Sequence, residues 1–162
     1  IGTEIQFKVG DKAVYPAHGV AEVTGIESHV VGGDKQTYYI LRILENGVKV
    51  MIPTGANGLR EIMSPREVDE VYGVLREKEL AVETTTWNRR YREYKEKIDS
   101  GDPKQIAAVL RDLYLLKNDK DLSFGERKML DTAKSLLVKE LSIAREIGEE
   151  QVEAQFTTIF HA

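Results

Sequence analysis

A tryptophan beside a run of arginines is the part of this sequence whose residue types are best suited to binding a ligand. Trp87 is the only tryptophan of the chain, and residues 87–97 (WNRRYREYKEK) hold five Lys or Arg against two Asp or Glu. An indole can stack on a nucleobase or enter a base step, while basic side chains bind phosphate. The alternative is that Trp87 begins a buried helical stripe with Tyr91 and Tyr94. The pattern alone leaves both interpretations open.

The position of this segment adds to the case for phosphate binding. A helix is expected to begin here with Thr86 as its N-cap. The first turn of a helix offers unpaired backbone N–H groups and a positive dipole end, which both attract phosphate. A second helix start follows Ser123 and Glu126, which have the spacing of a capping box. The candidate DNA-binding residues are Trp87, Thr86, Arg89, Arg90, Arg92, Lys95, Arg127 and Lys128.

Other kinds of chemistry find little support in the 162 residues. The absence of Cys excludes disulfides, cysteine nucleophiles and Cys-ligated zinc, and three scattered His do not predict a metal site. No nucleophile elbow, P-loop or dinucleotide fingerprint is present, so we expect no catalytic residues and no cofactor. No apolar run reaches the ~20 residues of a membrane span, and no signal peptide is visible. We therefore expect a cytoplasmic protein without a membrane partner.

The first part of the chain, residues 1–63, is expected to form a small antiparallel β domain. Residues 20–31 and 37–44 are rich in β-branched and aromatic residues, and residues 48–52 alternate before Pro53. Asn46-Gly47 predicts a hairpin with a type I′ turn. Short strands with close turns indicate a small barrel or a strongly bent sheet.

The hydrophobic period changes after Ser64-Pro65, and residues 65–162 are expected to form a bundle of four or five helices. Asp102-Pro103 predicts a further helix start, Gly148 is expected to end the long helix after Ser123, and a last helix is expected from about Glu149 to Phe160. Residues 77–86 lose the helical pattern and are expected to form a loop. The predicted fold class is therefore α+β, with a β domain followed by an all-α domain.

These features together resemble the CarD/CdnL family of bacterial transcription regulators. Four segments carry the resemblance: FKVGDKAVYPAHGV (7–20), TYYILRI to NGVKVMIP (37–53), TTTWNRRYREYKEKIDSGD (84–102), and residues 110–141 with LSFGERKML. They occur in the order and spacing of the family and cover about residues 7–148. The resemblance implies a Tudor-like β domain that docks on the RNA polymerase β subunit by strand pairing.

The resemblance also implies roles for particular residues. The family's minor-groove wedge matches Trp87, and the positions that face the polymerase match His29, Val31, Val50 and Met51. Some relatives have arginines where this chain has His29 and Met51, which favours strand pairing and apolar contact over salt bridges. The polymerase-binding candidates are His29, Val31, Val50, Met51 and Pro53.

The function expected from the resemblance is non-catalytic. A monomer would bind the polymerase β subunit and stabilise the open promoter complex, with its helical domain contacting DNA at the upstream edge of the melted region without reading sequence. The net charge of −4 gives no general attraction to DNA, so such a contact would rely on the local basic cluster and on the polymerase tether. The alternative is a protein–protein interaction scaffold with no DNA contact, in which Trp87 is buried.

Overall fold

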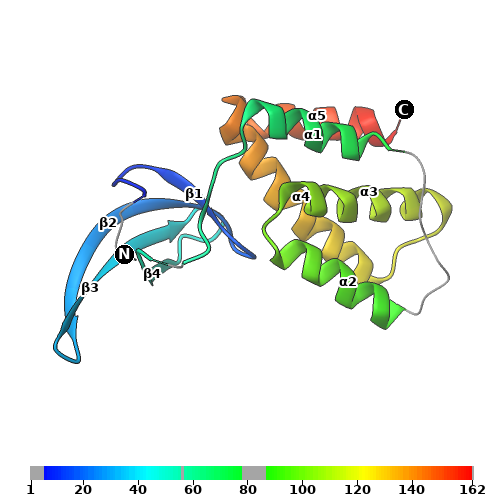
Figure 1. The fold of residues 1–162 in the computed structure, drawn as a ribbon. Helices are drawn as coiled ribbons and strands as arrows, with labels where there is room; N and C mark the ends of the chain where they lie inside the picture. Colours follow the sequence, from blue (N-terminus) through cyan, green and yellow to red (C-terminus); the bar gives the residue numbers. More distant parts are fainter. Residues whose placement is uncertain (1–5, 56, 78–86, 162) are drawn as a thin grey trace. The chain divides into compact units, whose positions relative to one another are not determined.

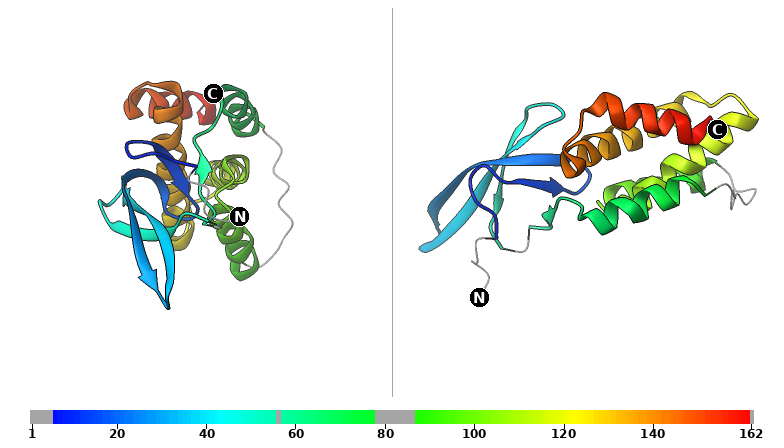
Figure 2. Two further views of the ribbon diagram at one scale, coloured as in Figure 1. Left: turned by 60° about the vertical axis from the view of Figure 1, so that its left-hand side comes forward. Right: turned by 90° about the horizontal axis from the view of Figure 1, so that it is seen from above.

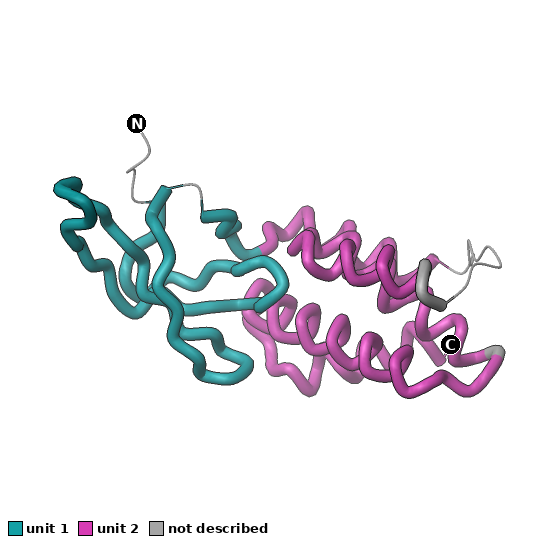
Figure 3. The backbone as a smooth tube through the Cα atoms, turned by 90° about the horizontal axis from the view of Figure 1, so that it is seen from below, with its two compact units in different colours: residues 1–62 teal, residues 63–162 magenta. Residues whose placement is uncertain are grey.

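The computed structural model describes residues 6–55, 57–77 and 87–161, apart from the side chains of residues 87–89 and 119. The chain divides into two compact units, residues 1–62 and residues 63–162 (Figure 3). The first contains an antiparallel sheet and the second contains helices, so the predicted α+β fold class is confirmed.

A five-stranded sheet forms the first unit. Its strands are β1 (Lys12–Tyr15), β2 (Gly19–Val31), β3 (Asp34–Ile43), β4 (Lys49–Pro53) and β5 (Arg60–Glu61). Their order is β4-β3-β2-β1-β5, and every pair is antiparallel. β2 and β3 form a long curved hairpin (Figures 1 and 2). A register shift between Val23 and Gly25 bends it, because a β-bulge increases local twist.

The two-residue turn of this sheet lies at Gly32-Gly33 and not at Asn46-Gly47. Gly32 and Gly33, between β2 and β3, have φ of +59° and +86°, as both central positions of a type I′ turn require. Asn46 does not have positive φ, and β3 and β4 are joined by the longer segment 44–48, in which the Asn46 side chain accepts a hydrogen bond from the Val48 N–H. The type I′ turn predicted at Asn46-Gly47 is therefore wrong.

Tyr38 and Tyr39 point to opposite faces, and this fixes the inner side of the sheet. Tyr39 is fully buried, and its hydroxyl accepts hydrogen bonds from the backbone N–H groups of Gln6 (2.8 Å) and Phe7 (3.1 Å). Phe7 also packs edge-on against the Tyr39 ring. The partly exposed Tyr38 lies on the outer face, so one of the two tyrosines is core, as expected from strand alternation.

Five helices form the second unit: α1 (Pro65–Leu75), α2 (Trp87–Asp99), α3 (Pro103–Asp119), α4 (Phe124–Arg145) and α5 (Glu149–Phe160). Capping boxes at Ser64 and Ser123, and the Asp102 side chain, begin α1, α4 and α3 as predicted. Gly148 was expected to end the long helix. Instead α4 ends at Arg145, where Glu146 adopts a left-handed conformation with φ of 54°, and Gly148 is the N-cap of α5.

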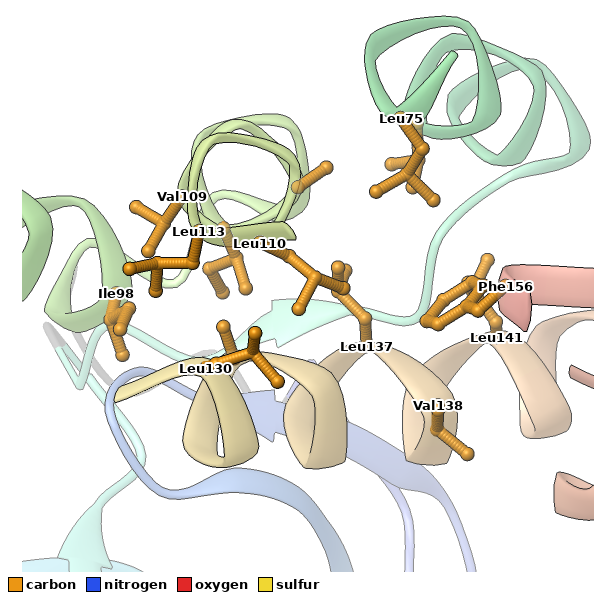
Figure 4. Packing of buried hydrophobic residues seen from close by; sticks show 14 of the residues in the cluster. Leu75, Ile98, Val109, Leu110, Leu113, Leu130, Leu137, Val138, Leu141 and Phe156 are labelled. Carbon is orange, nitrogen blue, oxygen red and sulfur yellow. The ribbon is translucent and has the colours of Figure 1, made fainter. Parts of the chain in front are cut away.

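The helices bury one continuous apolar core. α3 packs against α1, α2, α4 and α5. Figure 4 shows Leu110 and Leu113 of α3 facing Leu130 and Leu137 of α4. The buried Glu140 carboxylate accepts a hydrogen bond of 2.9 Å from the Met63 N–H, which fixes the start of the unit to α4. The core thus sets the directions in which the ends of the helices point.

Candidate functional site

The outer face of the β2–β3–β4 sheet brings most of the predicted polymerase-binding residues together. Cross-strand pairs share a face, and the register pairs His29 with Gln36 and Met51 with Ile40. His29, Val31, Met51 and Pro53 therefore point to the same side as Tyr38 and Ile40. Val31 is 56% and Met51 53% exposed. This surface, called the outer face below, consists of His29, Val31, Tyr38, Ile40, Met51 and Pro53.

His29 is one of the polar residues on this side of the sheet, where the register also places Glu27 opposite Tyr38 and Gln36 opposite His29. Its ring meets the Tyr38 ring edge-on, with 5.8 Å between the centroids, and its Nε2 lies 4.0 Å from the Glu27 carboxylate. Both His29 and Glu27 are about half exposed, so their interaction is screened by solvent. The outer face is therefore an apolar surface formed by Val31, Ile40 and Met51 beside a weakly paired imidazole and the polar side chains of Glu27 and Gln36.

Val50 differs from the other polymerase-binding candidates. It pairs with Leu41 and lies on the opposite face of β4 from Met51, where it is partly buried against the core of the β unit. Adjacent strand residues point to opposite faces, so the Val50 side chain does not share the outer face with Met51, and its role in polymerase binding stays a prediction. The sequence reasoning matched positions along the strand without separating its two faces.

The backbone of β4 offers an open edge, because no strand of the described residues lies beyond it. Hydrogen bonds from the Thr54 N–H to Thr37 and from the Ile43 N–H to Val48 set the antiparallel alternation. That alternation turns the N–H and C=O groups of Lys49 and Met51 away from β3. β4 is thus an edge strand with outward backbone groups, which the strand pairing expected from the resemblance requires.

The open edge is short. Pro53 has no N–H to donate, and its carbonyl already accepts a hydrogen bond of 2.9 Å from the Asn57 side chain. The alternation also turns the Val50 N–H inward, toward β3. Lys49 and Met51 are therefore the residues of β4 whose backbone groups can pair with an added strand.

In the helical unit, α2 begins at Trp87, as expected. Thr86 and the side chains of Trp87 and Arg89 lie outside what the structure describes, so neither interpretation of Trp87, as an exposed or as a buried residue, is tested. Further along α2, Tyr94 and Ile98 are buried but Tyr91 is 40% exposed. The expected apolar stripe is therefore wrong at Tyr91.

Arg90 lies on the inward side of α2 instead. Its side chain is 18% exposed, and its Nη1 lies 3.9 Å from the Glu126 carboxylate at the start of α4. A long aliphatic stem allows an arginine to be part of a helix interface while its head group meets a charge. The ion pair connects the first turns of α2 and α4, the two helix starts that the basic candidates flank.

Glu126 is a buried carboxylate with several partners. It is 2% exposed and accepts a hydrogen bond of 2.9 Å from the Ser123 N–H, and Lys120 Nζ lies 3.3 Å from it. Burial acts to raise the pKa of Glu126, but the hydrogen bonds from Ser123 and the charge of Lys120 outweigh it, and the pKa is lowered. Glu126 is therefore a charged partner for Arg90 at neutral pH.

The remaining described basic candidates are exposed: Arg92, Lys95, Arg127 and Lys128. Lys95 pairs with Asp99 across one helical turn at 3.3 Å, which offsets part of its charge. Phe124, the first residue of α4, is 76% exposed one turn before Lys128. Sequence reasoning missed Phe124, although its place directly after the Ser123 cap, outside the apolar stripe, is a usable signal.

Comparisons with known proteins place both units in one family. Residues 7–65 match the family described as CarD-like/TRCF RID domain, and residues 70–157 match the family described as CarD, C-terminal domain. The chain belongs to the CarD/CdnL family. A protein of Bacillus subtilis (strain 168) named "Putative transcription factor YdeB" is 32% identical over 151 residues, which cover 91% of this chain and 98% of the relative. This CarD/CdnL protein is thus a transcription regulator of a family related to RNA polymerase interaction.

A solved structure, CdnLNt from Myxococcus xanthus, is 54% identical to this CarD/CdnL protein over a match that covers 38% of this chain and 90% of that one, with a TM-score of 0.32.

Among the described residues, no cluster of His, Cys, Asp or Glu could hold a metal ion. Within the same residues, none of the helices is both long and apolar enough to span a membrane.

Proposed function

We propose that this CarD/CdnL protein binds the RNA polymerase β subunit through its β domain and stabilises the open promoter complex through its helical domain. In this proposal residues 1–63 are the polymerase-binding domain and residues 65–162 contact promoter DNA. The observation that carries it is the open edge of β4 beside the exposed outer face, in the unit that matches the CarD-like/TRCF RID family.

The contact with polymerase combines strand addition with apolar packing. An extended strand of the partner hydrogen-bonds to the outward backbone groups of Lys49 and Met51. Side chains of that strand then meet Met51 and Tyr38 on the outer face. Backbone pairing supplies affinity, and the side chains supply specificity.

The DNA contact uses the starts of α2 and α4. Arg92, Arg127 and Lys128 are exposed cations that can approach phosphates. Trp87 is the proposed wedge at the upstream edge of the melted region, where an aromatic side chain can enter a disrupted base step from the minor groove. The contact reads no sequence, because it relies on phosphates and on an opened step.

The two contacts act together. Polymerase opens promoter DNA reversibly, and a ligand that binds the open form better shifts the population toward it. The polymerase contact holds the helical domain close to DNA, so a weak DNA contact is enough at a high effective concentration. A monomer with a net charge of −4 can therefore act on DNA without binding it strongly alone.

The test of the polymerase contact is the substitution Met51→Pro. It removes an outward N–H but none of the bonds between β4 and β3, as is tolerated on an edge strand. Met51→Thr is the matched control, because it changes the same side chain and keeps the N–H. In a titration with isolated β subunit, we expect Met51→Pro to bind about tenfold or more weakly than Met51→Thr, since the partner loses a hydrogen bond and retains an unpaired acceptor.

Two results would contradict the proposal. Equal β-subunit binding by both variants, with circular dichroism showing an intact sheet, would exclude strand addition at this edge. Normal binding to polymerase with no effect of the parent protein on open-complex lifetime would favour the scaffold alternative. Val50→Pro is unsuitable for this test, because it removes a donor inside the sheet.

A further inference from the structure

A solvent-open cavity of about 490 Å³ lies at the surface of the helical unit, lined by residues of α1, the end of α4 and α5. Its size falls in the range of small-molecule sites, roughly 300–1,000 Å³. Val68 and Ile159 contribute apolar wall, and Tyr72, Arg76 and Arg145 contribute polar groups. None of the DNA-binding or polymerase-binding candidates whose side chains are described lines it.

Two guanidinium groups of the lining each lie over the same aromatic ring, that of Tyr72. The Cζ atoms of Arg76 and Arg145 lie 5.5 Å and 5.3 Å from the centroid of the Tyr72 ring. Arg145 Nη1 donates to the Tyr72 hydroxyl at 2.7 Å and also to Gln155. Arg76 forms no ion pair with any residue that the structure describes, so its guanidinium is available to an anion. A planar guanidinium can bind carboxylate or phosphate through two parallel hydrogen bonds.

The other polar groups described in the lining are neutral, except for one carboxylate that would repel a bound anion. Burial raises the pKa of the Tyr72 phenol above its ordinary value, despite the charge of Arg145, so the phenol is neutral at physiological pH. Its hydroxyl donates to Gln155 Oε1 at 2.7 Å, which orients that amide. Among the described residues of the lining, Asp69 is the carboxylate. Two arginines against one aspartate leave a local positive charge in an acidic chain.

We propose that this cavity binds a small organic anion, whose phosphate or carboxylate group pairs with Arg76 and Arg145 and whose apolar part lies against Val68 and Ile159. The inference does not depend on the proposed contacts with polymerase or DNA. It gives the helical domain a ligand site formed by α1, α4 and α5, apart from the starts of α2 and α4.

The test is a titration of the full chain with phenyl phosphate, benzoate and benzyl alcohol, followed by amide chemical shifts in NMR. The two anions separate phosphate from carboxylate as the recognised group, and benzyl alcohol is the neutral control. We expect saturable shifts at Tyr72 and Gln155 with at least one anion and none with the alcohol. No polymerase or DNA is needed, so failure here and failure of the proposed function are distinguishable.

Two variants that are expected to change the affinity for the anion in opposite directions make the test sharper. Arg76→Gln should weaken binding of the anion about tenfold, because a charge-assisted pair is lost. Asp69→Asn should tighten it a few-fold, because a like charge is removed. Arg66→Gln is the matched control, since Arg66 is an exposed arginine of α1 that pairs with Glu70 and does not line the cavity. Equal binding by all three variants, or equal shifts with benzyl alcohol, would overturn the proposal.

Discussion

Arg90 and Arg92 lie two positions apart on α2, and we predict that their replacement affects two different properties. These properties are the stability of the helical domain and its affinity for DNA. Arg90 is 18% exposed and faces the buried Glu126, whereas Arg92 is exposed. Replacing each with Met removes the charge and keeps most of the aliphatic stem. Arg90→Met should therefore lower the stability of the helical domain, and Arg92→Met should lower its affinity for DNA.

The magnitudes follow from the surroundings of each side chain. Unit charges about 4 Å apart attract by about 4 kcal/mol at an effective dielectric constant of about 20, before desolvation is subtracted. Glu126 keeps Ser123 and Lys120 as partners when Arg90 is replaced, so the free energy of unfolding should fall by only about 1–2 kcal/mol. Arg92→Met should change stability by less than about 0.5 kcal/mol, as at an ordinary surface position.

Two measurements separate the variants. Urea unfolding gives the change in the free energy of unfolding, and open-complex lifetime measured over a salt series gives the number of phosphate contacts. Arg92→Met should reduce the salt slope by about one unit, equally on different promoters. A stable Arg90→Met variant whose salt slope also falls by about one unit would refute the structural role and make Arg90 a phosphate ligand.

Three further predictions concern the helical domain and the boundary. Trp87→Ala should change the free energy of unfolding by less than about 0.5 kcal/mol and leave polymerase binding intact, but it should shorten the open-complex lifetime. Phe or Tyr at this position should restore part of that lifetime. A loss of stability of ~3–5 kcal/mol would instead show that Trp87 is a core residue. Burial raises the pKa of Tyr94 to about 12, so an absorbance titration should show this phenol ionising at higher pH than an exposed tyrosine. The free energy of unfolding should fall as the pH rises from about 10 to 12, because the phenol loses its proton at lower pH in the unfolded chain than in the folded one. Limited proteolysis should cut near residues 60–67 or 77–86, and resistance at both would contradict two separately folding domains.

The helix starts were predictable because their signals are local. A Ser or Asp cap and its partner lie within three residues of each other, so Ser64, Asp102 and Ser123 could be read directly from the sequence. The end of α4 was missed because Glu146 adopts positive φ there, which a glycine is normally expected to do. Gly148 lies two residues later and caps the next helix instead.

The turns of the sheet show a different limit of local reasoning. Asn46-Gly47 and Gly32-Gly33 are both strong turn sequences. Which of them becomes the two-residue turn depends on the register of β3 against its two neighbours. The register pairs Val31 directly with Asp34, whereas β3 ends at Ile43 and β4 begins only at Lys49. Strand pairing over the whole sheet therefore decides the turn.

Predicting the candidate site requires both local sequence signals and the tertiary packing of the helices. Basic residues at helix starts can be found by spacing, but the sequence does not say which of them faces a neighbouring helix. Arg90 and Glu126 are far apart in the chain and meet because Tyr94 and Met129 are buried in one core. That core turns the Arg90 side of α2 inward and leaves Arg92 exposed. Tertiary packing thus divides one basic cluster into a residue that holds α2 to α4 and residues that can reach phosphate.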